Sequence, residues 1–210
     1  MSIINKELMI PDVNFEVKVF FPKRFSALRR YYVGTHMQFI NSLCKTKSWS
    51  ATGGRAAAGF FTTHDKKFVF KIVKQAEFEN FLAFGPCYFD YLTKAFFHDY
   101  PCAMAKIVGA YIVKVRSPDT SEIDCEEHLL VSENLNFGIK TEDEQDIVRF
   151  DLKGSEFHRF VDTKMGPTGP QKSVLLDNNF LLQMRGRPVC LRWTDGINLD
   201  LCILNDILCL

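Results

Sequence analysis

The sequence contains no Cys-x-x-Cys pair and no short cluster of cysteine and histidine. Its seven cysteines are odd in number and scattered, which argues against a disulfide framework and a structural zinc site, and we expect a reducing compartment, the cytosol. The five histidines are scattered too, so nothing supports a metal or thiol enzyme. No stretch reaches the roughly 18 consecutive apolar residues of a membrane span, and the first residues lack the features of a signal peptide. The net charge of +1 gives no bulk attraction to nucleic acid.

Apolar residues, in contrast, are abundant and follow regular patterns. The chain of 210 residues is 47% hydrophobic and has 20 phenylalanines, enough for one domain of ordinary size or two small ones. There is no internal repeat. Alternation of apolar and polar residues predicts strands at 15–21, 105–115, 128–135 and 147–152.

Helical spacing of apolar residues marks three further segments. One or two helices are predicted over residues 25–43, with Gly34 as the candidate break. Another helix is predicted to begin at residue 77, and Gly85-Pro86 should interrupt or kink it. A last helix is predicted over about 198–208, and surface loops are expected in the acidic stretch around Pro118 and at 165–171.

The stretch "SATGGRAAAGFFTTHDKKFVFKIV" joins a small-residue loop to a predicted hairpin. Glycines let backbone N–H groups approach phosphate oxygens, and Lys71 on the second strand would add a fixed positive charge beneath the turn. Protein kinases bind nucleotide with such a loop, a strand lysine and a helix glutamate, and here Glu77 and Glu79 follow. Three structural readings stay open: an ordinary hairpin turn, a solvated strand lysine and exposed helix glutamates.

A family resemblance rests on several motifs that occur in order. They are "KSWSATGGRAAAGFFTTHDKKFVFKIV", "AFGPCYFDYL", "AKIVGAYIV", "LLVSENL", "RFDLKGS" and "VLLDNNFL". With these motifs the chain resembles the catalytic domain of phosphatidylinositol phosphate kinases over residues 14–210. Trp49 makes it look most like the PIKfyve type, which phosphorylates phosphatidylinositol 3-phosphate at the 5 position.

The resemblance implies an α+β, kinase-like N-terminal lobe with an antiparallel sheet and flanking helices, similar to that of SAICAR synthases. It places this lobe at about 14–135 and the start of an incomplete C-terminal lobe at about 136–210. It also implies ATP and Mg²⁺ as cofactors and a phosphoinositide at a membrane surface as the partner. The expected location is cytoplasmic, peripheral to endosomal or other internal membranes. A non-catalytic remnant that binds phosphoinositide or a partner protein is the alternative.

The resemblance also implies roles for individual residues, which we state as expectations. A loop over the ATP phosphates would contain Gly53, Gly54, Arg55 and Ala56, and Lys71 would bind the nucleotide. The backbone of the connector, Glu133, Asn134 and Leu135, would meet the adenine. Asp151, Lys153 and Ser155 match the family's signature at the cleft, and Lys71, Asp151 and Lys153 would be the catalytic residues. Lys153 would be a second cation for phosphate, unless it is an exposed lysine at a strand end.

The C-terminal part departs from the family pattern. The "DYSLLVG" motif with the catalytic aspartate and the "IID" motif with the metal-binding aspartate are not present, although Asp206 could be a degenerate start of the first. We therefore expect weak nucleotide binding, little or no catalysis and no metal ligands in this chain. The apolar residues of 199–208 would then need a partner chain, or would favour association.

Small basic clusters could orient the protein at an anionic membrane, although solvated surface charge is the commoner explanation for clusters of this size. One lies near the predicted N-terminal helix and one near the end of the chain. Their members are Lys23, Arg24, Arg29 and Arg30, and Arg185, Arg187 and Arg192.

Overall fold

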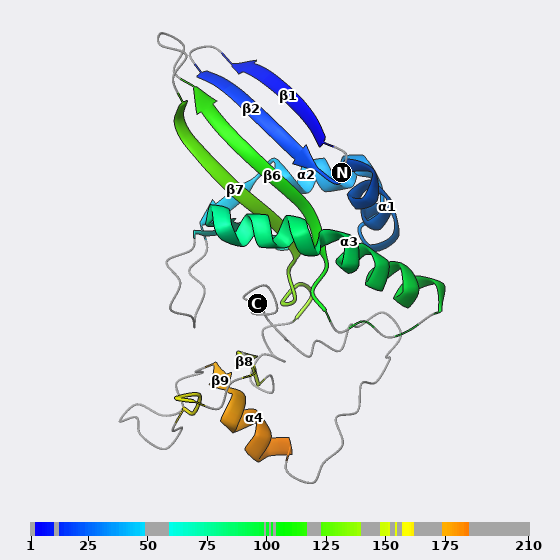
Figure 1. Ribbon diagram of the computed structural model, residues 1–210, viewed down its shortest axis with the longest axis vertical. Helices are drawn as coiled ribbons and strands as arrows, with labels where there is room; N and C mark the ends of the chain where they lie inside the picture. The colour runs from blue at the N-terminus through cyan, green and yellow to red at the C-terminus, as the bar shows by residue number, and fades with distance from the viewer. Residues whose placement is uncertain are drawn as a thin grey trace. The chain divides into compact units, whose positions relative to one another are not determined.

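The computed structural model describes most of the chain up to residue 184 (Figure 1). The chain divides into two compact units. The first unit takes residues 1–50, 57–89 and 106–134, and the second takes 51–56, 90–105 and 135–210. The described residues are 3–10, 13–48, 59–98, 100, 102, 104–116, 123–139, 148–151, 154, 157–161 and 174–184, with backbone alone at 3–10, 13, 124 and 184.

The first unit is built on a seven-stranded sheet in which every neighbouring pair is antiparallel. The strand order is β1-β2-β6-β7-β5-β4-β3. The predicted strands and the hairpin are confirmed, whereas β1 and β3, at the two edges, were not predicted. The strands are β1 Ile3–Ile10, β2 Val13–Phe20, β3 Thr46–Ser48, β4 Phe60–Thr63, β5 Phe68–Val73, β6 Ile107–Arg116 and β7 Ile123–Glu133.

Part of the acidic stretch that was expected to be a loop belongs to β7, so that expectation is wrong for residues 123–127. Acidic residues are tolerated there because basic residues lie on the neighbouring strand. Glu126 is directly opposite Lys114, and their side chains form an ion pair of 2.9 Å. Opposite charges at facing positions stabilise an antiparallel pair.

The first helical segment is two helices, α1 Pro22–Tyr32 and α2 His36–Leu43, with the break at Gly34 as predicted. Gly34 has a φ of 106°, a left-handed value that favours glycine. Thr35 then caps α2, because its hydroxyl accepts from the N–H of Gln38 at 3.2 Å while the Gln38 side chain accepts from the N–H of Thr35 at 2.8 Å. This capping box fixes where the second helix begins.

Helix α2 lies on one face of the sheet and α3 on the other (Figure 1). The core on the α2 side contains Phe39, Phe68, Val108 and Val131, all buried. Arg29 of α1 enters this core, since its guanidinium lies 4.5 Å from the Phe39 ring centroid and donates to the Val108 carbonyl at 2.7 Å. Burial lowers its pKa. Arg29 therefore does not belong to a basic surface cluster, and that part of the membrane expectation is wrong.

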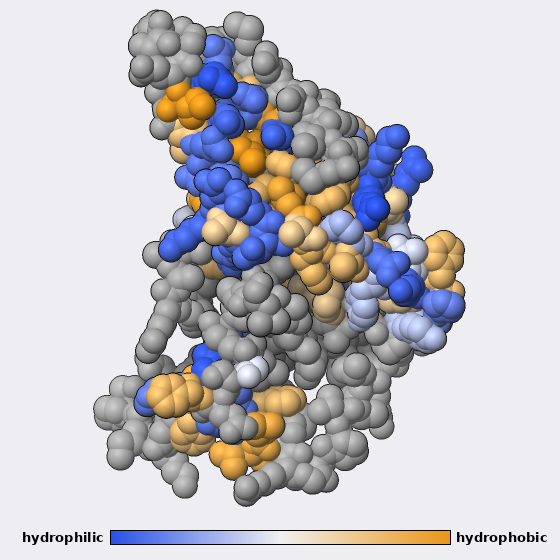
Figure 2. All heavy atoms as spheres, viewed as in Figure 1, coloured by the Kyte–Doolittle hydropathy of each residue, from blue (hydrophilic) through white to orange (hydrophobic). Residues whose placement is uncertain are grey.

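Helix α3, Gln75–Phe97, is continuous and contains Pro86, so the helix is not interrupted there, and the expected alternative, a kink, stays a prediction. Pro86 removes a helix hydrogen bond at a cost of about 3 kcal/mol, but Phe81 and Phe89 on either side are buried, and burial of a phenylalanine contributes about 1.5–3 kcal/mol. Gly85 is needed because a Cβ there would lie 2.8 Å from Cζ of Phe21. In Figure 2, hydrophilic side chains predominate on the outer surface of the first part of α3.

The second unit contains a short parallel pair, β8 Phe150–Asp151 with β9 Leu175–Leu176, followed by α4 Asp177–Met184. The strand predicted at 147–152 is thus confirmed only at its centre, and α4 was not predicted. The loop at 165–171, the helix at 198–208, Asp206 and the arginine cluster at 185–192 lie outside the described residues. No helix in the described part of the chain is both long and apolar enough to cross a membrane.

Candidate functional site

Lys71 lies in β5 and forms an ion pair with Glu77 in the first turn of α3. Its Nζ is 2.6 Å from Oε1 of Glu77, and the two side chains are 19% and 22% exposed. Of the two candidate glutamates, Glu77 is thus the partner, while Glu79 accepts from the Gln75 side chain at 2.8 Å. The alternative of a solvated strand lysine is wrong, because Lys71 is mostly buried and paired. An ammonium has three donors, so this pairing leaves capacity for a further anion.

Gly59, which follows the loop predicted to cover the phosphates, is bonded to the strand that contains Lys71. The N–H of Ile72 donates to the carbonyl of Gly59 at 2.9 Å, and Phe60 is the cross-strand neighbour of Lys71. Residues 53–56, which contain both predicted loop glycines, lie outside the described residues and end three positions before Gly59. The register of β4 and β5 therefore places Gly59, three positions after residue 56, beside the strand that contains Lys71.

The connector begins at the end of β7, where two backbone N–H groups are already used. The N–H of Glu133 donates to the Lys106 carbonyl at 2.9 Å, and that of Asn134 donates to the Lys67 carbonyl at 2.8 Å. The Asn134 side chain also donates to the Lys66 carbonyl at 2.7 Å. Contact of adenine with Glu133, Asn134 and Leu135 stays a prediction. Because the backbone N–H groups of Glu133 and Asn134 already donate within the chain, adenine would have to contact other groups of these two residues.

A second buried lysine, Lys106, holds the side chain of Glu133. Its Nζ lies 3.1 Å from Oε1 of Glu133, and its own backbone N–H donates to the same oxygen at 2.7 Å. The Lys106 side chain is only 6% exposed and lies 5.5 Å from the ring centroid of Tyr32. Sequence reasoning missed this residue, although a lysine at the start of a predicted apolar strand was a usable signal.

In the second unit, Asp151 of β8 is bound by Arg159. The Arg159 guanidinium lies 3.2 Å from the Asp151 carboxylate and also donates to the Asp151 backbone carbonyl. Asp177, the first residue of α4, accepts from Nε of Arg159 at 2.7 Å and from the N–H of Gly154 at 2.8 Å. Asp177 and Arg159 therefore hold the signature segment, residues 151–155, at two points. Lys153 and Ser155 lie outside the described residues.

The two carboxylates of this network favour the charged form of Arg159. Burial alone would lower the pKa of Arg159, but its hydrogen bonds and Coulombic attraction to Asp177 and Asp151 outweigh burial and raise that pKa. Neither Arg159 nor Asp177 was predicted as functional, because only the fold brings "FHR" and "LDNN" together. The Asp151 carboxylate is used by Arg159, and its proposed part in catalysis stays a prediction.

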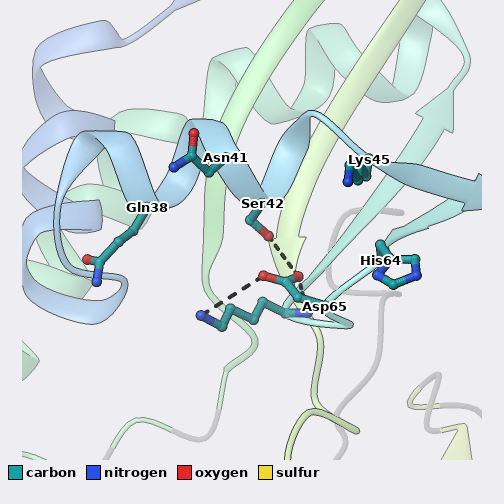
Figure 3. Close-up of a pocket in the computed structure, with 7 residues that line it drawn as sticks. Gln38, Asn41, Ser42, Lys45, His64 and Asp65 are labelled. Carbon is teal, nitrogen blue, oxygen red and sulfur yellow. Dashed lines mark hydrogen bonds and ion pairs between the residues drawn. The ribbon is translucent and has the colours of Figure 1, made fainter.

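A polar pocket of about 350 Å³ lies between the end of α2 and the turn joining β4 to β5 (Figure 3). Asp65 at its wall accepts from the hydroxyls of Ser42 and Thr63 at 2.8 and 2.6 Å and from the N–H of Lys67 at 3.1 Å. These bonds stabilise the turn. The pocket contains none of the residues predicted to bind nucleotide.

The described residues contain no group of three or more His, Cys, Asp or Glu that could hold a metal ion. We therefore assign no ligands for Mg²⁺ in this part of the chain and derive no step through the metal.

The antiparallel sheet, the helix that crosses it and the Lys71–Glu77 pair define the class of this protein: an α+β domain of the kind that forms the N-terminal lobe of kinases. The sequence model of the phosphatidylinositol-4-phosphate 5-kinase family matches residues 43–199, more than half of the chain. The chain belongs to this family, and the resemblance is confirmed.

Several relatives are 1-phosphatidylinositol 3-phosphate 5-kinases. The chain is 35% identical over 191 residues to FAB1 of Saccharomyces cerevisiae, an alignment that covers 91% of this chain and 8% of the yeast protein. It is 35% and 34% identical over 189 residues to the enzymes of Mus musculus and Homo sapiens, covering 89% of this chain and 9% of each relative. The chain thus spans less than a tenth of the length of these relatives.

Proposed function

We propose that this chain supplies the nucleotide-binding lobe of an ATP-dependent kinase that phosphorylates the 5-hydroxyl of phosphatidylinositol 3-phosphate. The observation that carries the proposal is the mostly buried Lys71–Glu77 pair, formed between β5 and the first turn of α3. The names of the relatives support the substrate. Phosphoryl transfer depends mainly on positioning and on neutralising phosphate charge, which a fixed ammonium can do.

In this proposal the residues predicted to meet the phosphates have separate roles. Lys71, oriented by Glu77, neutralises the nucleotide phosphates, and the loop containing Gly53, Gly54, Arg55 and Ala56 covers them. Lys153 of the signature segment adds a second positive charge, and Arg159 and Asp177 hold that segment at Asp151 and Gly154. When bound, Mg²⁺ would supply charge neutralisation at the phosphates.

The test is nucleotide affinity of the purified chain, measured by titration calorimetry with ATP. Lys71→Met should weaken binding about 10- to 100-fold, because a hydrogen bond to a charged group contributes about 1.5–3 kcal/mol. Lys94→Met is the matched control, since Lys94 forms an exposed pair of 2.7 Å with Asp90 and should not change the affinity. Equal ATP affinity of the Lys71→Met chain and the unchanged chain would refute the proposal.

We further propose that the protein acts at the cytoplasmic surface of endosomal or other internal membranes. A headgroup substrate requires contact with the bilayer surface. Co-sedimentation with vesicles that contain phosphatidylinositol 3-phosphate, compared with vesicles of phosphatidylcholine alone, tests the lipid contact. A chain that binds these vesicles but not ATP would instead be a non-catalytic phosphoinositide-binding module.

A further inference from the structure

We infer that Lys106 is a positioning residue for nucleotide binding, which acts through Glu133 to fix the backbone at the start of the connector. This inference rests on the proposed function. Lys106 itself is not expected to touch the nucleotide.

The first argument is where the pair lies along the chain. Residues 106–134 form one continuous segment of the first unit, and they contain β6 and β7. Lys106 is the first residue of this segment and Glu133 is the last but one. Their contacts therefore fasten together both ends of the hairpin, at the places where the chain enters and leaves the sheet.

The second argument is the number and geometry of the contacts. Glu133 and Lys106 bond through the backbone at 2.9 Å, while Oε1 of Glu133 lies 2.7 Å from the N–H and 3.1 Å from the Nζ of Lys106. One carboxylate oxygen thus accepts the backbone N–H of Lys106 and also forms an ion pair with its ammonium. This arrangement determines the side-chain direction of Glu133 as well as its backbone. The next residue, Asn134, is held in turn by the carbonyls of Lys66 and Lys67.

The third argument is energetic. A buried ion pair contributes little to stability on average, because desolvation of both charges offsets their attraction, and apolar pairs often replace it without loss. With Lys106 only 6% exposed, stability alone is a weak reason for a charge at this position. A requirement for one defined geometry at the connector is a better reason, since a charged pair accepts fewer alternative packings than an apolar one.

The experiment compares ATP with inorganic tripolyphosphate, which lacks the base and the sugar. Lys106→Met should weaken ATP binding about tenfold and leave tripolyphosphate affinity unchanged, since one misplaced hydrogen bond to the base corresponds to about 1.4 kcal/mol. Lys71→Met should weaken both ligands. A purely structural role of Lys106 would instead lower the two affinities together.

The same two strands provide a matched control. Nζ of Lys114 in β6 lies 2.9 Å from Oε2 of Glu126, the residue directly opposite in β7. Lys114→Met removes the same type of charge from that hairpin, and should leave the ratio of the two affinities at its original value.

A second variant tests the inference if Lys106→Met does not fold. Lys106→Met leaves the Glu133 carboxylate without its cation, so we also propose Lys106→Met/Glu133→Gln, which removes both charges and keeps an amide oxygen for the backbone N–H of residue 106. This double variant should unfold at a temperature close to the original and still lose ATP affinity selectively. An unchanged ratio of ATP to tripolyphosphate affinity in the folded double variant would overturn the inference. If the unchanged chain binds neither ligand, the proposed function itself is refuted.

Discussion

At the scale of single residues, the first unit largely buries two lysines, each beside one glutamate. A buried ammonium is costly unless a partner compensates its lost hydration, and Glu77 and Glu133 provide that compensation for Lys71 and Lys106. Asp65 differs, because its side chain is 38% exposed and it accepts from two hydroxyls and a backbone N–H, with Nζ of Lys67 at 4.0 Å. These positions are where single substitutions should have the clearest effects.

Glu77→Gln should weaken ATP binding about three- to tenfold, less than the loss expected for Lys71→Met. The glutamine can still orient the ammonium through its amide oxygen but no longer supplies a charge, and hydrogen bonds between neutral and charged partners are weaker than fully charged ones. Glu79→Gln in the same helix is the control and should bind ATP normally, since Glu79 pairs with Gln75. Calorimetric titration of both variants checks this, and equal losses in the two would contradict it.

Asp65→Ala should destabilise the fold by about 1–2 kcal/mol at neutral pH, because the Ser42 and Thr63 hydroxyls lose their acceptor. Burial raises the pKa of Asp65, but the hydrogen bonds it accepts outweigh burial and lower that pKa below its ordinary value of 3.8. The stabilisation is therefore complete above pH 3.8 and is lost as the pH falls through the lower folded-state pKa. Urea unfolding at about pH 7 and about pH 3 should show a difference between the two proteins that shrinks at the lower pH.

At the scale of elements, packing overrides local preference. Helix α3 continues through Gly85 and Pro86 because Phe81 and Phe89, before and after them, are buried in one aromatic cluster with α1. Phe25 contacts both Phe81 and Phe89, at centroid distances of 6.5 and 5.0 Å. The glycine is required for this approach, since its missing side chain leaves room for the Phe21 ring.

Gly85→Ala should therefore destabilise the protein by about 1–3 kcal/mol, the usual cost of overpacking, although alanine is the better helix former by about 1 kcal/mol. The added Cβ would lie 2.8 Å from the Phe21 ring. Thermal unfolding measures the effect. Phe21→Leu/Gly85→Ala should recover part of the loss, and a stabilising Gly85→Ala would show that the helix is not packed as described.

In the second unit, the Asp177 carboxylate should hold the backbone of the signature segment at Gly154. Asp177→Ala removes the acceptor of the Gly154 N–H and one partner of the mostly buried Arg159, so the hydrogen-exchange protection of the Gly154 amide should fall about tenfold or more. Asp90→Ala, in an exposed pair on α3, should leave that amide unchanged. Unaltered Gly154 exchange in the Asp177→Ala chain would show that the carboxylate does not hold this segment.

At the scale of the whole molecule, a ligand that binds only the folded chain raises its stability by mass action. ATP at about 100 times its dissociation constant should add about 2.7 kcal/mol to the free energy of unfolding. The melting temperature of the chain should therefore rise with ATP concentration, and the rise should be clearly smaller in Lys71→Met at the same ATP concentration. A melting temperature that does not depend on ATP in either protein would contradict the proposed function.

The periodic parts of this fold could be predicted, and the parts without a local signal could not. Strand β2, the hairpin of β4 and β5 and the two helices broken at Gly34 follow from alternation, helical spacing and turn residues. Strands β1 and β3 were missed because edge strands need no buried pattern of their own. From the sequence, the partner of Lys71 could be narrowed to two candidates, Glu77 and Glu79, since both lie near the start of α3.

The sequence by itself determined the family, the α+β class and the lysine that is the centre of the proposed site, because motif order and periodicity are properties of neighbouring residues. Only the tertiary structure decided that Glu77 is the partner of Lys71, that Lys106 holds Glu133, that Arg29 is an internal cation and that Asp177 reaches Gly154. These pairs are separated by 6 to 79 residues along the chain, and only strand order and helix packing bring them within hydrogen-bonding distance.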